Sequence, residues 1–438
     1  MPNPFLPNWE YIPDGEPRVF GNRVYLYGSH DSASSASFCD YKLKVWSASI
    51  DDLSHWTCHG DSFHTKDDQD HESDVKGVKH ELFAPDVVEK DGKYFLYAYI
   101  VNEKGCVGVS DRPEGPFSYV SNYVYHIENH YDNGTFIDPG VLVDDDGRVY
   151  IYCGYLGSYM AEINPDNMYE ILDNTYQENI IPVEEPFEFF EGCSLRKVNN
   201  TYYMIYSPKK GNRLVYATSE HPTGPFVYRG IIIDNGEDYP AGNNHGSICN
   251  IKGQWYIFYH RMTNGTIMSR RACVERINIL PDGTIPQVEM TSLGFDESLC
   301  PYEITKADTA CVLKGGCFIT EKDIFERTIS GITSGSILGW KYFDFGEDYS
   351  SKTMRINLKV TGTGCKTKVR ILLDHYETGE EIGVVDIGTS SGVYSNLVKA
   401  VTGRHAIYFC VEENKGGFFH EMFQHRLLFE LNEFVFEK

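Results

Sequence analysis

A short segment rich in tyrosine and aliphatic residues recurs five times between residues 24 and 259. Side chains of these types favour β-strands with a buried face. The copies are Val24–Tyr27, Tyr94–Tyr97, Val149–Tyr152, Tyr203–Tyr206 and Tyr256–Tyr259. The pattern predicts a buried strand at each of these five places.

The spacing of the five segments predicts a repeated sheet. Their first residues are 70, 55, 54 and 53 positions apart. Turn dipeptides such as Asp91-Gly92 and Asp146-Gly147 stand before them, as in tight β-hairpins. Repeats of this length, each with about four short strands, are typical of propeller blades, so we expect an all-β fold that begins with a five-bladed β-propeller. Long amphipathic helical patterns are missing, which argues against a TIM barrel or a Rossmann fold.

The first repeat is longer than the others and contains an acidic run at residues 67–74. We interpret this run as an inserted, solvated loop. Calcium binding is the alternative, because carboxylates are the ligands that calcium prefers.

The repeat ends after the turn at Pro281–Thr284, and a different β-rich stretch follows. Strands are predicted at Trp340–Phe345, Met354–Val360, Val369–Leu373, Ile382–Ile387 and His405–Val411. Short strands with glycine-rich turns favour a jelly-roll-like β-sandwich. We therefore expect a propeller domain at residues 1–301 and a β-sandwich domain at residues 302–438. Because no proline- or serine-rich linker separates them, we expect the two domains to pack together.

Charge and cysteine usage restrict the partners and the compartment. The chain has 438 residues, and 39 lysine and arginine residues against 63 aspartate and glutamate residues give a net charge of −24. This charge repels nucleic acid and anionic lipid, so we expect a neutral substrate, with no nucleic acid and no membrane as partner. Neither a membrane span nor a signal peptide is recognisable. The twelve cysteines lack metal-binding or disulfide spacing, so we expect free thiols in a cytoplasmic protein.

One ionisable residue stands at a similar distance before each repeated segment. These residues are Asp14, Asp86, Asp138, Glu191 and His245, which precede the segments by 10, 8, 11, 12 and 11 positions. Equivalent positions around a propeller axis would bring carboxylates together and drive their pKa values apart, so that one acts as an acid and another as a base. Two carboxylates in an aromatic-lined cavity are typical of glycoside hydrolysis. The alternative is a set of ordinary turn residues, since Asp-Gly and Asp-Pro are common in turns.

The segments around these residues resemble glycoside hydrolase family 43 over roughly residues 1–300. The matching motifs are Ile12–Pro17, Phe83–Asp86, Ile137–Pro139, Glu191–Ser194 and Asn244–Ser247. The resemblance implies a five-bladed propeller enzyme that acts on arabinose- and xylose-containing polysaccharides with inversion at the anomeric carbon. It implies Asp14 as the general base that activates water, Glu191 as the general acid, and Asp138 as the residue that orients the acid and tunes its pKa.

Three further residues enter through the same resemblance. His245 matches a position in the central channel that is often near calcium, so it is either a metal ligand or a hydrogen-bonded structural histidine. Arg271 matches an arginine that contacts substrate hydroxyls; we favour it over Arg270, because only one of two neighbours on a strand faces inward. Phe83 matches a wall of the sugar pocket where the family commonly has tryptophan. Calcium is the one cofactor that the resemblance allows, and we expect no organic cofactor.

The C-terminal stretch resembles carbohydrate-binding module family 6 at Trp340–Phe345 and Thr402–Tyr408. Tyr394 is the candidate for stacking on a sugar ring. The alternative is that this domain only supports the propeller or adds a residue to its pocket.

Together these features predict an inverting exo-glycosidase that removes terminal α-L-arabinofuranose from arabinoxylan-derived oligosaccharides. Arabinose- and xylose-containing oligosaccharides are the expected partners, and β-D-xylosidase activity stays open as a second or as the main activity. A catalytically silent sugar-binding propeller is the alternative from another class. The complete set of Asp14, Asp138 and Glu191 argues against it, because a binding protein has no need of a separated acid and base.

Overall fold

The computed structural model describes residues 1–127, 136–413 and 426–438, and it shows an all-β protein as predicted. Helical structure in these ranges is limited to two short 3₁₀ turns, η1 (Asp173–Thr175) and η2 (Ala307–Thr309). No helix among the described residues has the length and apolar character that crossing a membrane requires.

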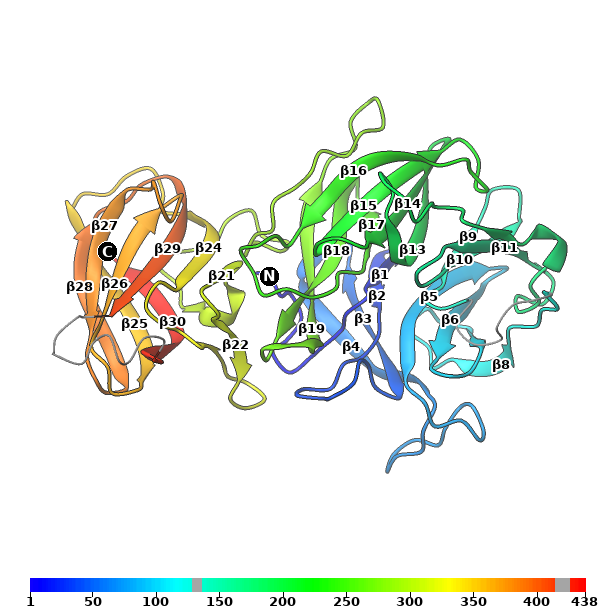
Figure 1. Ribbon diagram of the computed structural model, residues 1–438, viewed down its shortest axis with the longest axis horizontal. Coiled ribbons are helices and arrows are strands. Elements are labelled where there is room, and N and C mark those ends of the chain that lie inside the picture. Colours follow the sequence, from blue (N-terminus) through cyan, green and yellow to red (C-terminus); the bar gives the residue numbers. More distant parts are fainter. Residues whose placement is uncertain (128–135, 414–425) are drawn as a thin grey trace.

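Five antiparallel sheets follow one another in the N-terminal part of the chain (Figure 1). Sheet 1 contains β1 (Glu16–Phe20), β2 (Arg23–Tyr27), β3 (Lys42–Ser49) and β4 (Asp52–His64). Sheet 2 contains β5 (Leu82–Lys90), β6 (Lys93–Ile100), β7 (Gly105–Ser110) and β8 (Ser118–Asn122). Sheet 3 contains β9 (Gly140–Val143), β10 (Val149–Cys153), β11 (Tyr159–Ile163) and β12 (Gln177–Glu178). Sheet 4 contains β13 (Phe189–Val198), β14 (Thr201–Pro208), β15 (Arg213–Ser219) and β16 (Val227–Asp234), and sheet 5 contains β17 (Ser247–Ile251), β18 (Gln254–Thr263) and β19 (Thr266–Ile277).

The repeated tyrosine-rich segments form the second strand of each sheet: β2, β6, β10, β14 and β18. These strands are paired on both sides because each sheet runs in chain order. Turn chemistry sets the register of the hairpins. Between β5 and β6, Asp91 and Gly92 both adopt positive φ, 53° and 76°, as a two-residue hairpin turn requires.

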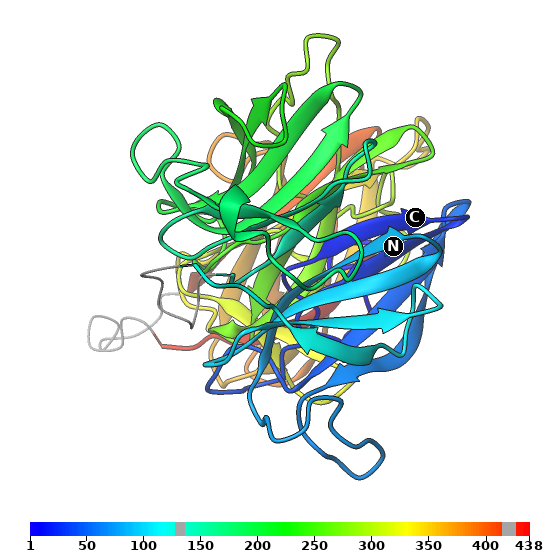
Figure 2. The same ribbon diagram turned by 90° about the vertical axis from the view of Figure 1, so that its right-hand side faces the viewer.

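The five sheets pack against one another in order, and the fifth closes onto the first. Four clusters of buried side chains join sheets 1 and 2, 2 and 3, 3 and 4, and 4 and 5. A fifth cluster joins Leu26 of sheet 1 to Phe258 of sheet 5. In Figure 2 the blue and cyan sheets lie on one side of the common centre and the green sheets on the other. Four of these five sheets have four strands, as is typical of propeller blades, and the first strands of neighbouring sheets contact one another at the centre.

Two larger sheets form the C-terminal part, drawn yellow to red in Figure 1. One contains β20 (Thr305–Lys306), β22 (Phe318–Glu321), β23 (Arg327–Ser330), β25 (Thr353–Gly362), β28 (Gly392–Lys399) and β30 (Phe429–Glu437). The other contains β21 (Val312–Lys314), β24 (Ile337–Asp344), β26 (Thr367–Leu373), β27 (Glu381–Ile387) and β29 (Arg404–Glu413). The five strands predicted here are found as β24, β25, β26, β27 and β29.

The C-terminal sheets share a core with sheets 4 and 5. One continuous cluster of buried side chains runs from Tyr216 in β15 through Ile257 in β18 to Trp340 in β24. Polar contacts reinforce this packing: the backbone N–H of Glu321 donates to Asn264 Oδ1 at 2.7 Å, at the tip of the β18–β19 hairpin. The two parts of the chain are therefore joined by an extensive buried surface.

Candidate active site

A cavity of about 470 Å³ opens where the first strands of the N-terminal sheets meet. Its wall combines carboxylates, an arginine and a histidine with aromatic and aliphatic side chains. The lining residues are Asp14, Phe38, Cys39, Phe83, Ile137, Asp138, Tyr155, Phe190, Glu191, Asn243, His245, Ile267 and Arg270. A concave, largely apolar wall with a few convergent polar groups is typical of a small-molecule site.

Local backbone conformation aims the three predicted catalytic carboxylates at this cavity. Asp14 and Asp138 each lie two residues before the first strand of their sheet, and both adopt positive φ, 56° and 53°. Such conformations are uncommon for non-glycine residues and concentrate at functional sites. Glu191 lies within β13, at a point where the pairing with β14 is interrupted by a β-bulge. Bulges commonly redirect a side chain beside an active site.

Gly192 follows Glu191 and lies directly against the ring of His245. A Cβ atom at this position would come within 3.0 Å of His245 Cδ2, and its φ of 75° is also one that favours glycine. The glycine therefore allows the bulge that carries Glu191 to lie next to His245.

Asp14 is held as an ionised carboxylate. It is almost fully buried, Arg270 Nη1 donates to its Oδ1 at 2.8 Å, and Ser29 Oγ donates to its Oδ2 at 2.7 Å. Burial alone would raise the pKa of Asp14, but the positive charge of Arg270, assisted by His245, outweighs this effect and lowers the pKa below its ordinary value. A lowered pKa keeps this carboxylate available as a proton acceptor.

Arg270 is in turn fixed by Asp31. The Nε and Nη2 atoms of Arg270 donate to the two carboxylate oxygens of Asp31, both at 2.9 Å, and its backbone N–H donates to Asp31 Oδ2. The guanidinium also lies over the ring of Phe38, 4.9 Å from its centroid. A bidentate pair of this kind sets the orientation of the arginine as well as its charge.

Glu191 and Asp138 have the opposite electrostatic environment. Burial raises the pKa of Glu191, and the negative charge of Asp14 adds to this, although His245 opposes it. Burial likewise raises the pKa of Asp138 to about 7, against the opposing charge of His245, and the neighbouring charge of Glu191 contributes to the rise. Glu191 is the less buried of the two, and Asn243 Nδ2 donates to its Oε1 at 3.5 Å. The cavity therefore pairs an ionised carboxylate with carboxyl groups that retain a proton to higher pH.

Two buried histidines lie next to these carboxylates, and their pKa values are shifted in opposite directions. Burial and the charge of Arg270 lower the pKa of His260 to about 3, so this ring is neutral, and its Nδ1 accepts a hydrogen bond from the backbone N–H of Asp14. Burial alone would lower the pKa of His245, but the charges of Asp14, Asp138, Glu16 and Glu191 raise it. These carboxylates therefore favour the protonated form of His245.

The surroundings of His245 also fit a cation. Glu16 Oε1 is a buried carboxylate oxygen without a hydrogen-bond partner. The hydroxyl of Ser194 donates to the other oxygen of Glu16 at 3.1 Å and lies 2.7 Å from the hydroxyl of Ser247. Oxygen atoms of these kinds are ligands that calcium accepts. Arg196 already pairs with the other oxygen of Glu16, so a calcium ion here would share the carboxylate charge with Arg196.

The expectation for Arg271 is wrong, and Arg270 takes the place predicted for it. Arg271 points away from the cavity and pairs with Asp308, with Nη1 3.0 Å from Oδ2, while Nη2 donates to Asn8 Oδ1. Side chains alternate along β19, so Arg270 shares its face with Ala272 and Val274, which pack towards sheet 1, where Asp14 lies. Alternation allows only one of the two arginines to face the cavity, and the packing of β19 against sheet 1 selects Arg270.

Substitutions at the two arginines are expected to have different effects. Arg271→Ala leaves Asp308 buried without its partner, so it should lower the free energy of unfolding by about 3–5 kcal/mol while the folded enzyme keeps its kcat. Arg270→Lys removes the bidentate contact and should lower kcat/KM about 10- to 100-fold, the worth of one charge-assisted hydrogen bond. Urea unfolding and initial rates on an aryl glycoside measure both effects. A catalytic loss confined to Arg271→Ala would contradict this assignment.

Phe83 lies in the cavity wall, whereas Asp86 does not line the cavity. Phe83 precedes Tyr94 by 11 positions, the same distance that separates Asp138 and His245 from their segments. Asp86 is fully buried instead, and Arg18 donates to it from Nε at 3.0 Å. In sheet 2 the position equivalent to Asp138 and His245 is therefore occupied by the aromatic residue Phe83. Asp86 is part of a structural ion pair with Arg18.

Several site residues have no signal in the sequence pattern. Asp31 holds Arg270, and His260 accepts a hydrogen bond from the backbone of Asp14. The cavity wall also contains Phe38, Tyr155, Phe190, Asn243 and Ile267. Most lie on loops whose length differs between repeats. Tyr155 and Phe190 stand out only because they are aromatic residues close to predicted site segments; their rings lie 5.2 Å apart.

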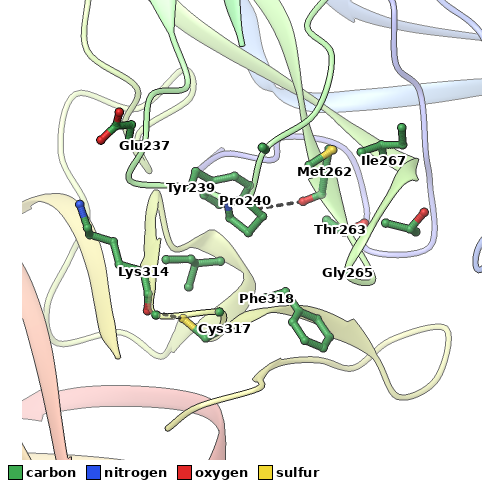
Figure 3. A pocket seen from close by; sticks show the side chains of 15 residues that line it. Glu237, Tyr239, Pro240, Met262, Thr263, Gly265, Ile267, Lys314, Cys317 and Phe318 are labelled. Carbon is green, nitrogen blue, oxygen red and sulfur yellow. Dashed lines mark hydrogen bonds between the residues drawn. The ribbon is translucent and has the colours of Figure 1, made fainter. Parts of the chain in front are cut away.

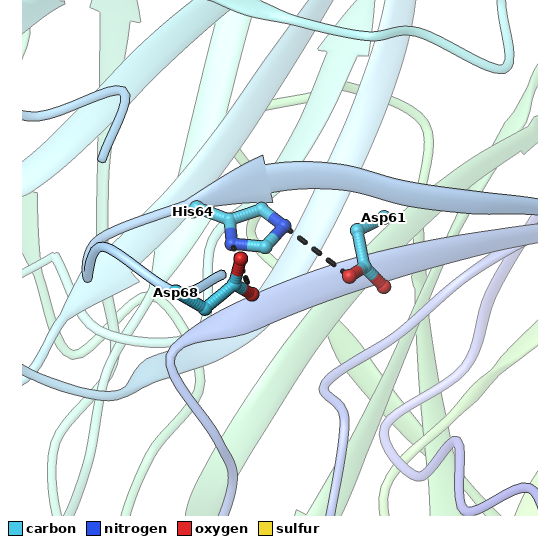
Figure 4. Close-up of side chains that lie close together, drawn as sticks. All are labelled: Asp61, His64 and Asp68. Carbon is cyan, nitrogen blue, oxygen red and sulfur yellow. Dashed lines mark ion pairs between the residues drawn. The ribbon is translucent and has the colours of Figure 1, made fainter. Parts of the chain in front are cut away.

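A group of potential metal ligands lies away from the cavity, at the end of β4 (Figure 4). His64 Nε2 is 3.4 Å from Asp61 Oδ2, and His64 Nδ1 is 3.7 Å from Asp68 Oδ2. Because the two nitrogens face different carboxylates, the contacts are those of a histidine bridging two acids. Asp68 belongs to the acidic run at residues 67–74, and its side chain is 43% exposed.

Comparison with known proteins identifies the family. The model of glycosyl hydrolases family 43 matches residues 2–285. A xylosidase/arabinosidase of Thermoclostridium stercorarium is 36% identical over 93% of this chain and 95% of its own length. A family 43 β-xylosidase/α-arabinofuranosidase from a compost metagenome, solved with xylotriose in a calcium-free form, is 28% identical with a TM-score of 0.55, covering 66% of this chain and 99% of that one.

A solved family 43 arabinoxylan arabinofuranohydrolase from Bacillus subtilis, in complex with cellotetraose, is similar in fold over the whole chain. Its TM-score is 0.56 at 21% identity, and the match covers 100% of this chain and 97% of that one. The family model spans the segments that carry Asp14, Asp138 and Glu191. On these grounds the chain belongs to glycosyl hydrolases family 43.

Proposed function

We propose that this protein is an inverting exo-glycosidase that releases terminal α-L-arabinofuranose from arabinoxylan-derived oligosaccharides. The observation that carries the proposal is one cavity in which Asp14 has a lowered pKa and Glu191 a raised pKa. Relatives named xylosidase/arabinosidase and arabinoxylan arabinofuranohydrolase support the substrate class. β-D-Xylosidase activity is the second candidate, favoured by the relative named β-xylosidase and by the structure solved with xylotriose.

The proposed reaction uses the two carboxylates on opposite sides of the scissile bond. Asp14 takes a proton from a water molecule, whose oxygen attacks the anomeric carbon of the terminal sugar. Glu191 gives its proton to the glycosidic oxygen as the bond to the anomeric carbon breaks, so the leaving chain departs as a neutral alcohol. Separate acid and base, with water between base and sugar, invert the anomeric configuration.

Asp138 and Arg270 act on these two groups. Asp138 lies beside Glu191 in the cavity, and because a charge on one of two neighbouring carboxyl groups disfavours ionisation of the other, the pair retains a proton to higher pH. Arg270 keeps Asp14 ionised and presents its remaining donor capacity to the cavity. When bound, calcium would be held near His245 by Glu16 and would supply positive charge to the carboxylates; each proton transfer is carried out by the chain's own residues.

The architecture extends this proposal. We interpret the five N-terminal sheets as the blades of a five-bladed propeller, with a boundary near residue 302, and the two C-terminal sheets as a β-sandwich similar to carbohydrate-binding module family 6. Tyr394 stays the candidate for sugar stacking; it lies on the edge strand β28, and its hydroxyl donates to the Ser390 carbonyl at 2.7 Å. Cytoplasmic location stays a prediction, under which imported oligosaccharides are the substrates.

Proton NMR of the products, recorded within minutes, tests the function directly. Arabinoxylan oligosaccharides should yield arabinose first as its β-anomer, because inversion converts the α-linkage. Release of xylose as the α-anomer would instead identify a β-xylosidase with the same mechanism. Release of neither sugar would favour the catalytically silent sugar-binding propeller.

A further inference from the structure

A second cavity, of about 370 Å³, lies at the junction between sheet 5 and the C-terminal sheets (Figure 3). One wall comes from the β18–β19 hairpin, with Met262, Thr263 and Ile267. The opposite wall comes from the β21–β22 connection, with Cys317 and Phe318. The cavity therefore exists only because the C-terminal part packs beside the catalytic sheets.

Ile267 lines this junction cavity and also the catalytic cavity. It lies three residues before Arg270 on β19, and 40% of its surface is exposed. One partly exposed side chain thus forms a wall of both cavities. A ligand chain that leaves the catalytic cavity past Ile267 would enter the junction cavity.

The chemistry of the junction wall suits a neutral, ring-shaped ligand. Phe318 is partly exposed, and its ring packs between two glycines: a Cβ at Gly265 would come within 3.1 Å of Cδ2 and one at Gly331 within 3.0 Å of Cε1. The cation in this wall, Lys314, is neutralised by Asp238, with Nζ 2.5 Å from Oδ1. An aromatic face with a neutralised charge favours sugar rings over anions.

The two walls are held in place before any ligand binds. Leu313 N–H donates to the carbonyl of Asp238 at 2.6 Å, and Tyr239 Oη donates to the carbonyl of Met262 at 3.1 Å. The contact between Glu321 and Asn264 anchors β22 to the hairpin tip. A preorganised wall of this kind loses little entropy on binding.

We propose that the junction cavity is a subsite for the leaving chain, a neutral β-linked xylo-oligosaccharide, and that Phe318 is its main stacking residue. The inference rests on the proposed function, because it assumes that the terminal sugar occupies the catalytic cavity beside Asp14 and Glu191. The C-terminal part then determines which substrates bind well and takes no part in the chemistry.

Phe318→Ala tests this subsite through the length of the substrate. KM for arabinosylated xylo-oligosaccharides should rise about tenfold or more with kcat nearly unchanged, the result of losing binding common to ground state and transition state. Kinetics on an aryl arabinofuranoside, which lacks the chain, should stay within about twofold of the wild type. Thr266→Arg, which would fill the cavity and leave Phe318 in place, should produce the same pattern.

Phe325→Ala is the matched control, because Phe325 is a 72% exposed phenylalanine of the C-terminal part that lies in neither cavity wall. It should change neither KM. Unchanged KM for the oligosaccharides in both Phe318→Ala and Thr266→Arg would overturn the subsite, as would an equal loss on both substrates. A rise of KM in Tyr155→Ala alone would place the chain on the opposite rim and would also overturn it. A wild-type enzyme that releases sugar from neither substrate would refute the proposed function itself.

Discussion

Asp14→Asn is expected to lower kcat by about 10²–10⁴-fold on every substrate, whatever its leaving group. The amide keeps the shape of the side chain but has no basic oxygen to take a proton from water. Because water attack is required for every glycoside, a better leaving group cannot compensate. Initial rates on an aryl arabinofuranoside and on arabinoxylan oligosaccharides measure this loss.

The Asp14→Asn variant should still fold, because Arg270 keeps both of its hydrogen bonds to the Asp31 carboxylate. Thermal unfolding and substrate binding at equilibrium check that the cavity is intact. Turnover within tenfold of the wild type in a folded variant would exclude Asp14 as the base.

Glu191→Ala is expected to separate substrates by the quality of their leaving group. An oligosaccharide leaves as a poor alkoxide unless it is protonated, so its kcat should fall about 10²–10⁴-fold. An aryl glycoside with an acidic phenol leaves without a proton and should lose much less. Steady-state kinetics on a series of aryl glycosides of increasing phenol pKa would show a steep dependence in the variant and a shallow one in the wild type. Equal losses on both substrate classes would contradict the role of Glu191 as proton donor.

The pH dependence of kcat/KM provides the matching control. The raised pKa of Glu191 means that its proton is retained to higher pH, so wild-type activity on oligosaccharides should fall as pH rises through that raised value. The lowered pKa of Asp14 means that activity should persist below the ordinary aspartate value of about 3.9. In Glu191→Ala the loss of activity at high pH should disappear for aryl substrates. Its persistence would assign that loss to another group.

The all-β fold and the positions of its main strands could be predicted because both depend on local properties. Tyrosine and aliphatic residues at regular spacing mark the strands β2, β6, β10, β14 and β18, which lie in the middle of their sheets and are buried on both faces. Asp-Gly turns set the hairpins beside them, as at Asp91-Gly92. The candidate carboxylates Asp14, Asp138 and Glu191 could be found for the same reason, since their distance to the next strand repeats along the chain.

The surroundings of these carboxylates could not be predicted in this way. The lowered pKa of Asp14 depends on Arg270, which is 256 residues away in the sequence and belongs to the fifth sheet. Asp86 has nearly the same distance to its segment as the other candidates, yet it lies three residues beyond Phe83 in β5 and is buried against Arg18 of sheet 1 and Val141 of sheet 3. The junction cavity depends on the packing of the β21–β22 segment against sheet 5, which no local sequence pattern encodes.

The sequence by itself determined the periodic strands, the hairpins and the residue types at the start of each first strand. Neighbours in the chain control the backbone conformation and the pattern of buried and exposed side chains along a strand. The tertiary structure alone decided that Arg270 and not Arg271 faces Asp14, because strand alternation defines two faces and only packing selects the one that meets sheet 1. It also decided the opposite pKa shifts of Asp14 and Glu191, since these arise from burial and from charges carried by other sheets. The tertiary structure also places Ile267 in the walls of two cavities, because β19 packs between the catalytic cavity and the C-terminal sheets.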